Sequence, residues 1–381
     1  MGQYFINHFP HAILKAFPCD IIEAFSEETA VKSLDHCPLC KSDIGNSGKP
    51  LFKSTDYISG DIFSILRCGK CGFIFTDSYP DQESEFGRYY PKEEYYGSDE
   101  GRRFISPMEK MIFAFRVRRA RRVLDLKSKG CVLDIGCGRG LLLQLLKSRG
   151  WECHGTELSE PLALRMRENH GIDVRACSIQ DCNFADKMFD AVSIYHVLEH
   201  ISDPKGVLQE VRRIIKNDGM LIIGVPNIAS FQSVISGPKW FHLDIPRHVA
   251  HFSPGTLKQM VEECGFQVVS AKSFSAEYDP YGLMQSILNI LGCRQNFLYE
   301  LLRSKKVERA NAKVLFYDLP ISLLLSVILL IPSIALEFIL SLFQRNGTLK
   351  ILCRPALTGS FSDDRLQYTS SKENGTSHVQ G

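Results

Sequence analysis

The chain lacks a strong charge of either sign. Its 45 basic and 43 acidic residues leave a formal net charge of +2 over 381 residues. Because this balance leaves no excess of basic side chains, a dedicated nucleic-acid-binding protein is disfavoured. The first 20 residues also lack a basic segment followed by a long apolar core, so we expect no secretory signal peptide. These absences favour a cytoplasmic protein.

Cysteine, in contrast, is plentiful, with 13 residues. In a reducing compartment we expect these thiols to be free or metal-bound. Four of them form two CxxC pairs, and four thiolates on two short turns can complete a tetrahedral zinc shell. These metal-binding candidates are Cys37, Cys40, Cys68 and Cys71. Residues 51–66 between the pairs are predicted to form a hairpin that turns near Ser59-Gly60-Asp61. We predict a structural zinc ribbon that depends on its metal to fold, with a redox dithiol as the alternative.

The most informative motif is Asp134-Ile135-Gly136-Cys137-Gly138-Arg139-Gly140. It follows an apolar run that is predicted to be a buried strand, and a helical run begins directly after it. Glycines at these positions let the backbone approach a ligand where a Cβ atom would clash. Glu157 ends the next predicted strand, where a carboxylate can accept hydrogen bonds from both hydroxyls of a ribose. The motif therefore predicts a nucleoside-binding turn, although its GxGxG spacing differs from the GxGxxG of pyrophosphate binders.

Strands and helices are predicted to alternate through the middle of the chain. The predicted strands are 131–135, 152–156, 172–177, 189–195, 219–225 and 266–273, and the helices are 141–149, 160–169, 204–216 and 254–264. This alternation predicts an α/β fold with a doubly wound parallel sheet, in which ligands bind at the carboxyl ends of the strands. A further strand is predicted at 347–354. A dehydrogenase-like domain is the alternative on these grounds.

From Asp134 to about Phe274 the chain resembles the class I S-adenosylmethionine (SAM)-dependent methyltransferases. The resemblance implies a Rossmann-like sheet of seven strands whose last strand is antiparallel, with SAM as the methyl donor. It implies that the glycine turn holds the amino-acid end of SAM, that Glu157 holds the ribose and that Asp181 contacts the adenine. A surface turn is the alternative for Asp181. The implied cofactor-binding residues are Asp134, Gly136, Cys137, Gly138, Gly140, Glu157, Asp181 and Tyr195.

Two histidine-containing segments follow predicted strands at the ligand-binding edge of the sheet. His196, Glu199 and His200 are spaced to share one face of a helical turn, and His248 and His251 follow the next strand. Methyl transfer requires that the acceptor be aligned and deprotonated, and a neutral histidine suits proton removal. We predict His200 as general base and Glu199 as its orienting partner. His196, His248 and His251 are further catalytic candidates, and hydrogen bonding within the core is the alternative for them all.

Two narrower resemblances leave the chemistry open. In zinc-ribbon sugar C-methyltransferases, a pair similar to Glu199-His200 removes a proton beside a ketone. In ubiquinone-pathway O-methyltransferases and small-RNA 2′-O-methyltransferases, acids and histidines of this region hold a divalent metal, although His196 stands where those enzymes often carry an acid. A second metal at the His/Glu site thus stays open. An RNA methyltransferase that uses its ribbon on RNA and a non-catalytic SAM-binding scaffold are the alternative functions.

One apolar run, residues 319–343, is the predicted membrane contact. Residues 319–336 carry no charge and as a helix measure about 27 Å, which is marginal for a bilayer. Pro332 interrupts the run, and Glu337 follows it. We therefore predict a bent helix pair in one leaflet, on a peripheral or monotopic protein at the cytoplasmic membrane face. Buried helices in a dimer interface are the alternative. Basic residues flank the run on both sides: Arg303, Lys305, Lys306, Arg309, Lys313, Arg345, Lys350 and Arg354.

The position of this run before the last strand places it near the rim of the site. It therefore favours a small-molecule acceptor that is amphiphilic, such as a lipid-linked sugar. The aromatic and basic segment before the core is interpreted as a lid or as packing for the ribbon. The predicted division is 1–34 as an N-terminal extension, 35–80 as the ribbon, 81–128 as the linker or lid, 129–280 as the SAM-binding core, 281–346 as the hydrophobic helical insertion, 347–358 as the final strand and 359–381 as a disordered tail.

Overall fold

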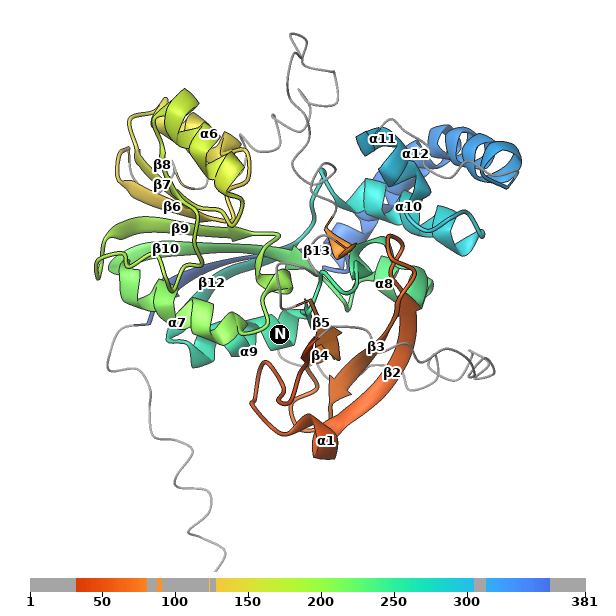
Figure 1. Ribbon diagram of the computed structural model, residues 1–381, viewed down its shortest axis with the longest axis horizontal. Coiled ribbons are helices and arrows are strands. Elements are labelled where there is room, and N and C mark those ends of the chain that lie inside the picture. The colour runs from red at the N-terminus through yellow and green to blue at the C-terminus, as the bar shows by residue number, and fades with distance from the viewer. Residues whose placement is uncertain (1–31, 81–87, 91–122, 124–127, 305–312, 357–381) are drawn as a thin grey trace, which may run out of the picture.

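The computed structural model describes residues 32–80, 88–90, 123, 128–304 and 313–356. The predicted disordered tail lies outside these residues, as do nearly all of the N-terminal extension and most of the linker. Figure 1 shows a central sheet with helices on both faces, a small N-terminal sheet below it and a helical region beyond one end.

The central sheet has seven strands in the order β12-β13-β10-β9-β6-β7-β8. All of its pairings are parallel except those of β13, which is antiparallel to both of its neighbours. This confirms the predicted fold class and the predicted antiparallel final strand. The strands are β6 (Cys131–Ile135), β7 (Glu152–Thr156), β8 (Asp173–Arg175), β9 (Phe189–Tyr195), β10 (Ile215–Pro226), β12 (Phe266–Ser273) and β13 (Thr348–Pro355).

Alternating side chains of the strands build two apolar layers. Val132 packs in the layer of α5 (Leu141–Lys147) and α6 (Glu160–His170), whereas Leu133 packs in that of α7 (Pro204–Ile214) and α9 (Pro254–Glu263). The pleat sends successive side chains to opposite faces, so a continuous apolar run serves both layers. Helix α9 begins where the sequence predicts, because Ser253 and Thr256 form a reciprocal capping box.

The N-terminal module contains the predicted hairpin, formed by antiparallel β2 (Gly48–Thr55) and β3 (Ile62–Cys68). Strand β4 (Ile74–Thr76) pairs with β3 on one side and with β11 (Ala250–His251) on the other. Strand β11 belongs to the core region of the chain, so the ribbon and the core share one four-stranded sheet. The sequence did not predict this pairing, because β11 is only two residues long. The module's short elements are β1 (Lys32–Ser33), α1 (Ile44–Ser47) and β5 (Ser78–Tyr79).

The hydrophobic insertion lies between β12 and β13, as predicted. It contains α10 (Asp279–Ile290), α11 (Phe297–Ser304) and α12 (Leu319–Leu342), and a π-helical turn, Val314–Asp318, leads into α12. The predicted bent helix pair is wrong, because Pro332 lies inside a single helix of 24 residues. Ser322 and Glu337, one on each side of the proline, are both buried against the protein.

One pair of cysteines differs from the predicted free or metal-bound state. Cys177 and Cys182 form a disulfide across the turn that follows β8. Their Cα atoms are 5.9 Å apart, within the range that a disulfide requires. Proximity in the folded turn is a feature that cysteine counting alone does not reveal.

Candidate functional site

A cavity of about 270 Å³ opens at the carboxyl ends of β6 and β9. The glycine motif forms one side of it, and two tyrosines, Tyr195 and Tyr278, contribute to the lining. Five predicted cofactor-binding residues line this cavity: Asp134, Gly136, Cys137, Gly138 and Tyr195. The remaining lining residues are Arg139, Leu141, Leu142 and Tyr278. The cavity lies at the edge of the sheet where doubly wound folds bind their ligands.

Two glycines shape the turn for different reasons. Gly136 has a φ of 65°, and an added Cβ atom would lie 2.4 Å from a methyl of Val197. Gly138 has a φ of 54°, but an added Cβ atom would have no heavy atom within 4 Å. The first glycine is therefore required by packing, and the second leaves open space above the backbone for a ligand.

Glu157 lies beside this turn. Its carboxylate accepts hydrogen bonds from the backbone N–H of Gly138 at 2.9 Å and of Ser159 at 3.1 Å. These two donors hold the carboxylate next to the cavity that the glycines line. Gly140 forms the N-cap of α5 and does not line the cavity. Asp181 is exposed, accepts a hydrogen bond from Ser178 and is also absent from the lining.

A second group of side chains combines both predicted histidine segments. Glu199, His200 and His248 place one potential ligand atom each within 4.8 Å of one another. Glu199 and His200 lie on a 3₁₀ turn, Leu198–His200, that follows β9, and the ring of His200 meets the ring of His248 edge-on at 4.6 Å. The structure thus brings three of the five predicted catalytic residues together.

Hydrogen bonds to backbone carbonyls determine which ring nitrogens are available. Nδ1 of His200 lies 2.9 Å from the carbonyl oxygen of Arg247, and Nδ1 of His248 lies 2.9 Å from that of His242. A carbonyl oxygen only accepts, so each Nδ1 carries the hydrogen. When neutral, both imidazoles therefore keep the lone pair on Nε2. A lone pair of this kind is what a general base uses.

Burial tunes the charges of this group. It raises the pKa of Glu199 to about 7, although the positive charge of His200 acts in the opposite direction. Burial also holds the pKa of His248 well below its usual value, so this ring is neutral at pH 7. Burial opposes the ionisation of Asp244, but the charge and hydrogen bond of Arg247, together with the charges of His248 and His200, lower the pKa of Asp244 to about 2. The neutral ring of His248 therefore lies near a buried carboxyl group, that of Glu199, whose pKa is raised.

The other two predicted histidines, His196 and His251, differ in their relation to this group. Nδ1 of His196 is 3.1 Å from Oε1 of Glu199, so this residue contacts the group through the glutamate. His251 does not join it, since its Nε2 lies 3.0 Å from the hydroxyl of Thr76 in the ribbon. Burial lowers the pKa of His251 to about 3. The expected convergence of His251 is therefore corrected by the structure, because β11 directs this side chain into the junction with β4.

The comparison with protein families now identifies this region of the chain. Residues 108–271 match the family described as a methyltransferase domain. This region belongs to the class I SAM-dependent methyltransferases. The match includes the glycine turn, Glu157 and the His/Glu group, and it extends into β12.

Curated relatives agree with the methyltransferase assignment over part of their length. A ubiquinone biosynthesis O-methyltransferase from Cereibacter sphaeroides is 30% identical over 152 residues, which are 37% of this chain and 62% of the relative. Its counterpart from Actinobacillus pleuropneumoniae is 31% identical over 135 residues, which are 32% of this chain and 57% of the relative. The chain thus covers less than two thirds of these relatives.

Among solved structures, a SAM-dependent methyltransferase from Archaeoglobus fulgidus superposes with a TM-score of 0.42 at 22% identity. The superposition covers 70% of this chain and 99% of that chain. So low a score adds nothing to the assignment, which rests on the sequence match.

Two residues near the methyltransferase cavity were missed by the sequence analysis. The ring of Tyr278 lies 4.3 Å from that of His196 and 6.3 Å from that of Tyr195. Buried His242 supplies the carbonyl oxygen that orients His248, and burial lowers its own pKa to about 3. No local pattern marks either residue: Tyr278 lies in the turn before α10, and His242 lies in a short 3₁₀ helix, Phe241–Leu243.

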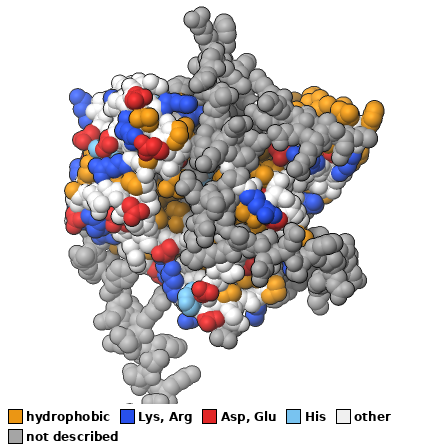
Figure 2. All heavy atoms as spheres, viewed as in Figure 1, with side chains coloured by type: hydrophobic (Ala, Val, Ile, Leu, Met, Phe, Trp, Pro, Cys, Tyr) orange, Lys and Arg blue, Asp and Glu red, His pale blue; other side chains and the backbone are white. Residues whose placement is uncertain are grey.

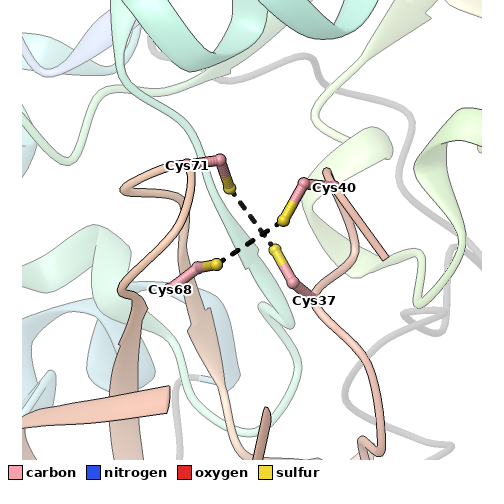
Figure 3. A group of neighbouring side chains, drawn as sticks. All are labelled: Cys37, Cys40, Cys68 and Cys71. Atoms are coloured by element: carbon pink, nitrogen blue, oxygen red, sulfur yellow. Dashed lines mark hydrogen bonds between the residues drawn. The ribbon is translucent and has the colours of Figure 1, made fainter. Parts of the chain in front are cut away.

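The four predicted zinc ligands lie together in the ribbon, far from this chemistry in sequence. Figure 3 shows their side chains directed toward a common centre from two turns. Sγ of Cys37 lies 3.6 Å from that of Cys71, and Sγ of Cys40 lies 3.6 Å from that of Cys68. A tetrahedral shell with Zn–S bonds of about 2.3 Å requires S···S distances of about 3.8 Å. These two distances, and the grouping of all four Sγ atoms within 4.8 Å of one another, fit a zinc ion.

Proposed function

We propose that this protein transfers a methyl group from SAM to a small-molecule acceptor. The observation that carries the proposal is the glycine-lined cavity with Glu157 beside it, linked to the His/Glu group through the ring of Tyr278, which meets that of His196, and through the contact of His196 with Glu199. SAM supplies an activated methyl group, so the protein must hold it, align the acceptor and take up a proton. Glu157 is assigned to the ribose and the glycine turn to the amino-acid end.

We assign Nε2 of His200 as the atom that takes the proton from the acceptor. This nitrogen keeps its lone pair because Nδ1 is committed to the carbonyl of Arg247. Glu199 and His248 adjoin His200. Both side chains are buried, so little water reaches this side of the proposed acceptor site. Glu199, with a pKa raised to about 7 by burial, can stabilise the imidazolium that forms.

Cofactor binding is tested by substitution at Gly138. Gly138→Val is expected to weaken the binding of the demethylated product, S-adenosylhomocysteine, about 100-fold or more, since the new side chain occupies open space in the cavity and is strained at positive φ. Calorimetry measures this directly. Gly255→Ala, at a site in α9 where an added Cβ atom has no neighbour, is the control and should bind normally. Folded wild-type protein that gives no heat with SAM or with its product contradicts the proposal.

The acceptor class is tested with labelled SAM and cell extracts. Transfer of label into a sugar, lipid or other small molecule supports the proposal, and transfer into RNA favours the alternative of an RNA methyltransferase. Binding of SAM with no turnover on any fraction supports the scaffold. The site also fits a divalent metal, because Glu199, His200 and His248 each place one potential ligand atom within 4.8 Å of the others. Activity that is lost with chelator and restored by Mg²⁺ would identify that variant of the mechanism.

We further propose that the acceptor is amphiphilic and that α12 holds the protein on a membrane surface. Val314–Leu342 is long and apolar enough to cross a bilayer by length and composition, yet only 11% of its most apolar window is buried in the protein. Figure 2 shows an apolar patch at the upper right, where Figure 1 places this helix. The exposed residues of the helix include Phe316, Leu324, Val327, Ile328, Ile331, Phe338 and Leu342.

The opposite side of α12 argues against a membrane-spanning orientation. Ser322, Ser333 and Glu337 are all buried against the protein. The carboxylate of Glu337 accepts hydrogen bonds from Gln232 at 3.0 Å and from Asn346 at 2.6 Å. The helix is thus bound lengthwise to the core, and crossing a bilayer would draw the core in with it. In a monotopic arrangement the apolar face of α12 lies in one leaflet, and its polar face keeps its contacts with the core.

Membrane attachment is tested by charge on the exposed face. Val327→Glu combined with Ile331→Glu is expected to weaken binding to phospholipid vesicles at least about tenfold, because two side chains that are 76% and 75% exposed lose their apolar contact. Flotation measures the bound fraction. Ile62→Glu, on the ribbon, is the control and should leave binding unchanged. A wild-type protein that stays off vesicles, and whose dimer the double variant dissociates, would show instead that α12 forms a dimer interface.

A further inference from the structure

Arg247 contacts both the ribbon and the proposed general base. Its guanidinium is fully buried and donates at 2.8 Å to Asp56 of the ribbon and at 2.8 Å to Asp244. It also donates to the carbonyl of Tyr89 at 2.9 Å and lies over the ring of Tyr57. A buried cation is tolerated only when it is paired and hydrogen-bonded, and Asp56 and Asp244 together offset the charge of this side chain.

The main chain of the same arginine contacts the base. Its carbonyl oxygen accepts the hydrogen bond from Nδ1 of His200 that leaves Nε2 with the lone pair. Arg247 therefore touches the ribbon with its side chain and His200 with its backbone. A shift of the guanidinium displaces the carbonyl, and this alters both the tautomer and the direction of the imidazole ring.

Neighbouring contacts hold the same loop in one position. Thr76 of the ribbon donates through its hydroxyl to the carbonyl of His248 at 2.7 Å and through its N–H to the carbonyl of Val249 at 2.9 Å. On the other side, the N–H of Val249 donates to the carbonyl of Glu199 at 2.8 Å. The loop is thus clamped between the ribbon and the turn that carries the base.

We propose that Asp56 is a positioning residue for His200 and acts through Arg247, so that the ribbon is a working part of the catalytic site. The inference rests on the proposed function of that site. Asp56 touches neither the cofactor cavity nor the His/Glu group, so its role lies in the placement of the 244–251 loop. This role predicts that loss of Asp56 lowers turnover without lowering cofactor affinity, because the glycine turn and Glu157 do not depend on this loop.

The test is Asp56→Asn in the full-length, zinc-loaded protein. We expect kcat to fall about 10- to 100-fold, while the KM of the acceptor and the Kd of S-adenosylhomocysteine change less than about twofold. Amide hydrogen exchange of residues 244–251 should become at least about tenfold faster. Asp56→Glu, which keeps the charge, should recover part of kcat. The matched control is Lys41→Gln, which removes the exposed ribbon-to-core ion pair of Lys41 with Asp203 at 2.8 Å and should change neither readout.

Two results would overturn the inference. One is a folded Asp56→Asn protein with normal kcat and normal exchange in the loop. The other is an equal loss of cofactor affinity and turnover, which indicates general destabilisation. If the wild-type protein shows no turnover, the proposed function fails, whereas the exchange comparison still decides whether Asp56 orders the loop.

Discussion

His200→Gln is expected to lower kcat about 10²- to 10⁴-fold, the usual contribution of a positioned general base. Glutamine keeps a hydrogen-bond donor for the carbonyl of Arg247 but has no basic nitrogen to receive a proton. The cofactor cavity is lined by other residues, so the affinity for S-adenosylhomocysteine should stay within about twofold. Rates under saturating SAM and acceptor, together with calorimetry on the same samples, measure both quantities.

The control for this experiment is His170→Gln, at the exposed end of α6, which should leave both quantities unchanged. Near-normal turnover of the His200→Gln protein would remove this residue as the base. The remaining candidates would then be His248, whose Nε2 also keeps its lone pair, and Glu199, whose pKa is raised to about 7 by burial.

Loss of the ribbon metal is expected to have the second large effect. Cys37→Ser should reduce bound zinc from about one equivalent to near none and unfold the ribbon, because the metal supplies several kcal/mol or more in modules of this size. Since β4 pairs with β11, the unfolded ribbon should also release the 244–251 loop and suppress turnover. Metal analysis and thermal unfolding followed by circular dichroism check these results.

The control for the ribbon is Cys264→Ser, which replaces a buried thiol of the core with a group of similar size. It should retain the zinc and lower the melting temperature far less than Cys37→Ser. Wild-type protein prepared without chelator that holds under half an equivalent of zinc is the outcome that counts against a structural metal.

Local patterns in the sequence predicted most of the central sheet. Strand β6 and the turn after it were predicted to the residue, because an apolar run that ends at glycines leaves few conformations. The final strand, Thr348–Pro355, was predicted at 347–354 despite the long insertion before it. These features depend on residues that are close together in the chain, so they can be predicted from the sequence without knowledge of the fold.

Contacts between distant segments were not predictable in the same way. The sequence predicted His200 as the base and did not distinguish between His248 and His251 as further candidates. The pairing of β11 with β4 directs His251 to Thr76, whereas His248 lies beside His200. Glu337 looked like an obstacle to membrane insertion, yet it faces Gln232 and Asn346 inside the protein. Tyr278 comes from the turn after β12 and lines the cavity together with residues that follow β6 and β9.

The sequence by itself determined the doubly wound fold, the cofactor turn and the clustering of cysteine, because each depends on spacing along a short stretch of chain. Only the tertiary structure decided which histidine has a free nitrogen, which face of α12 stays exposed and how the ribbon reaches the site through Asp56 and Arg247. These outcomes depend on burial and on hydrogen-bond partners that lie far apart in the chain, and such partners are chosen by packing.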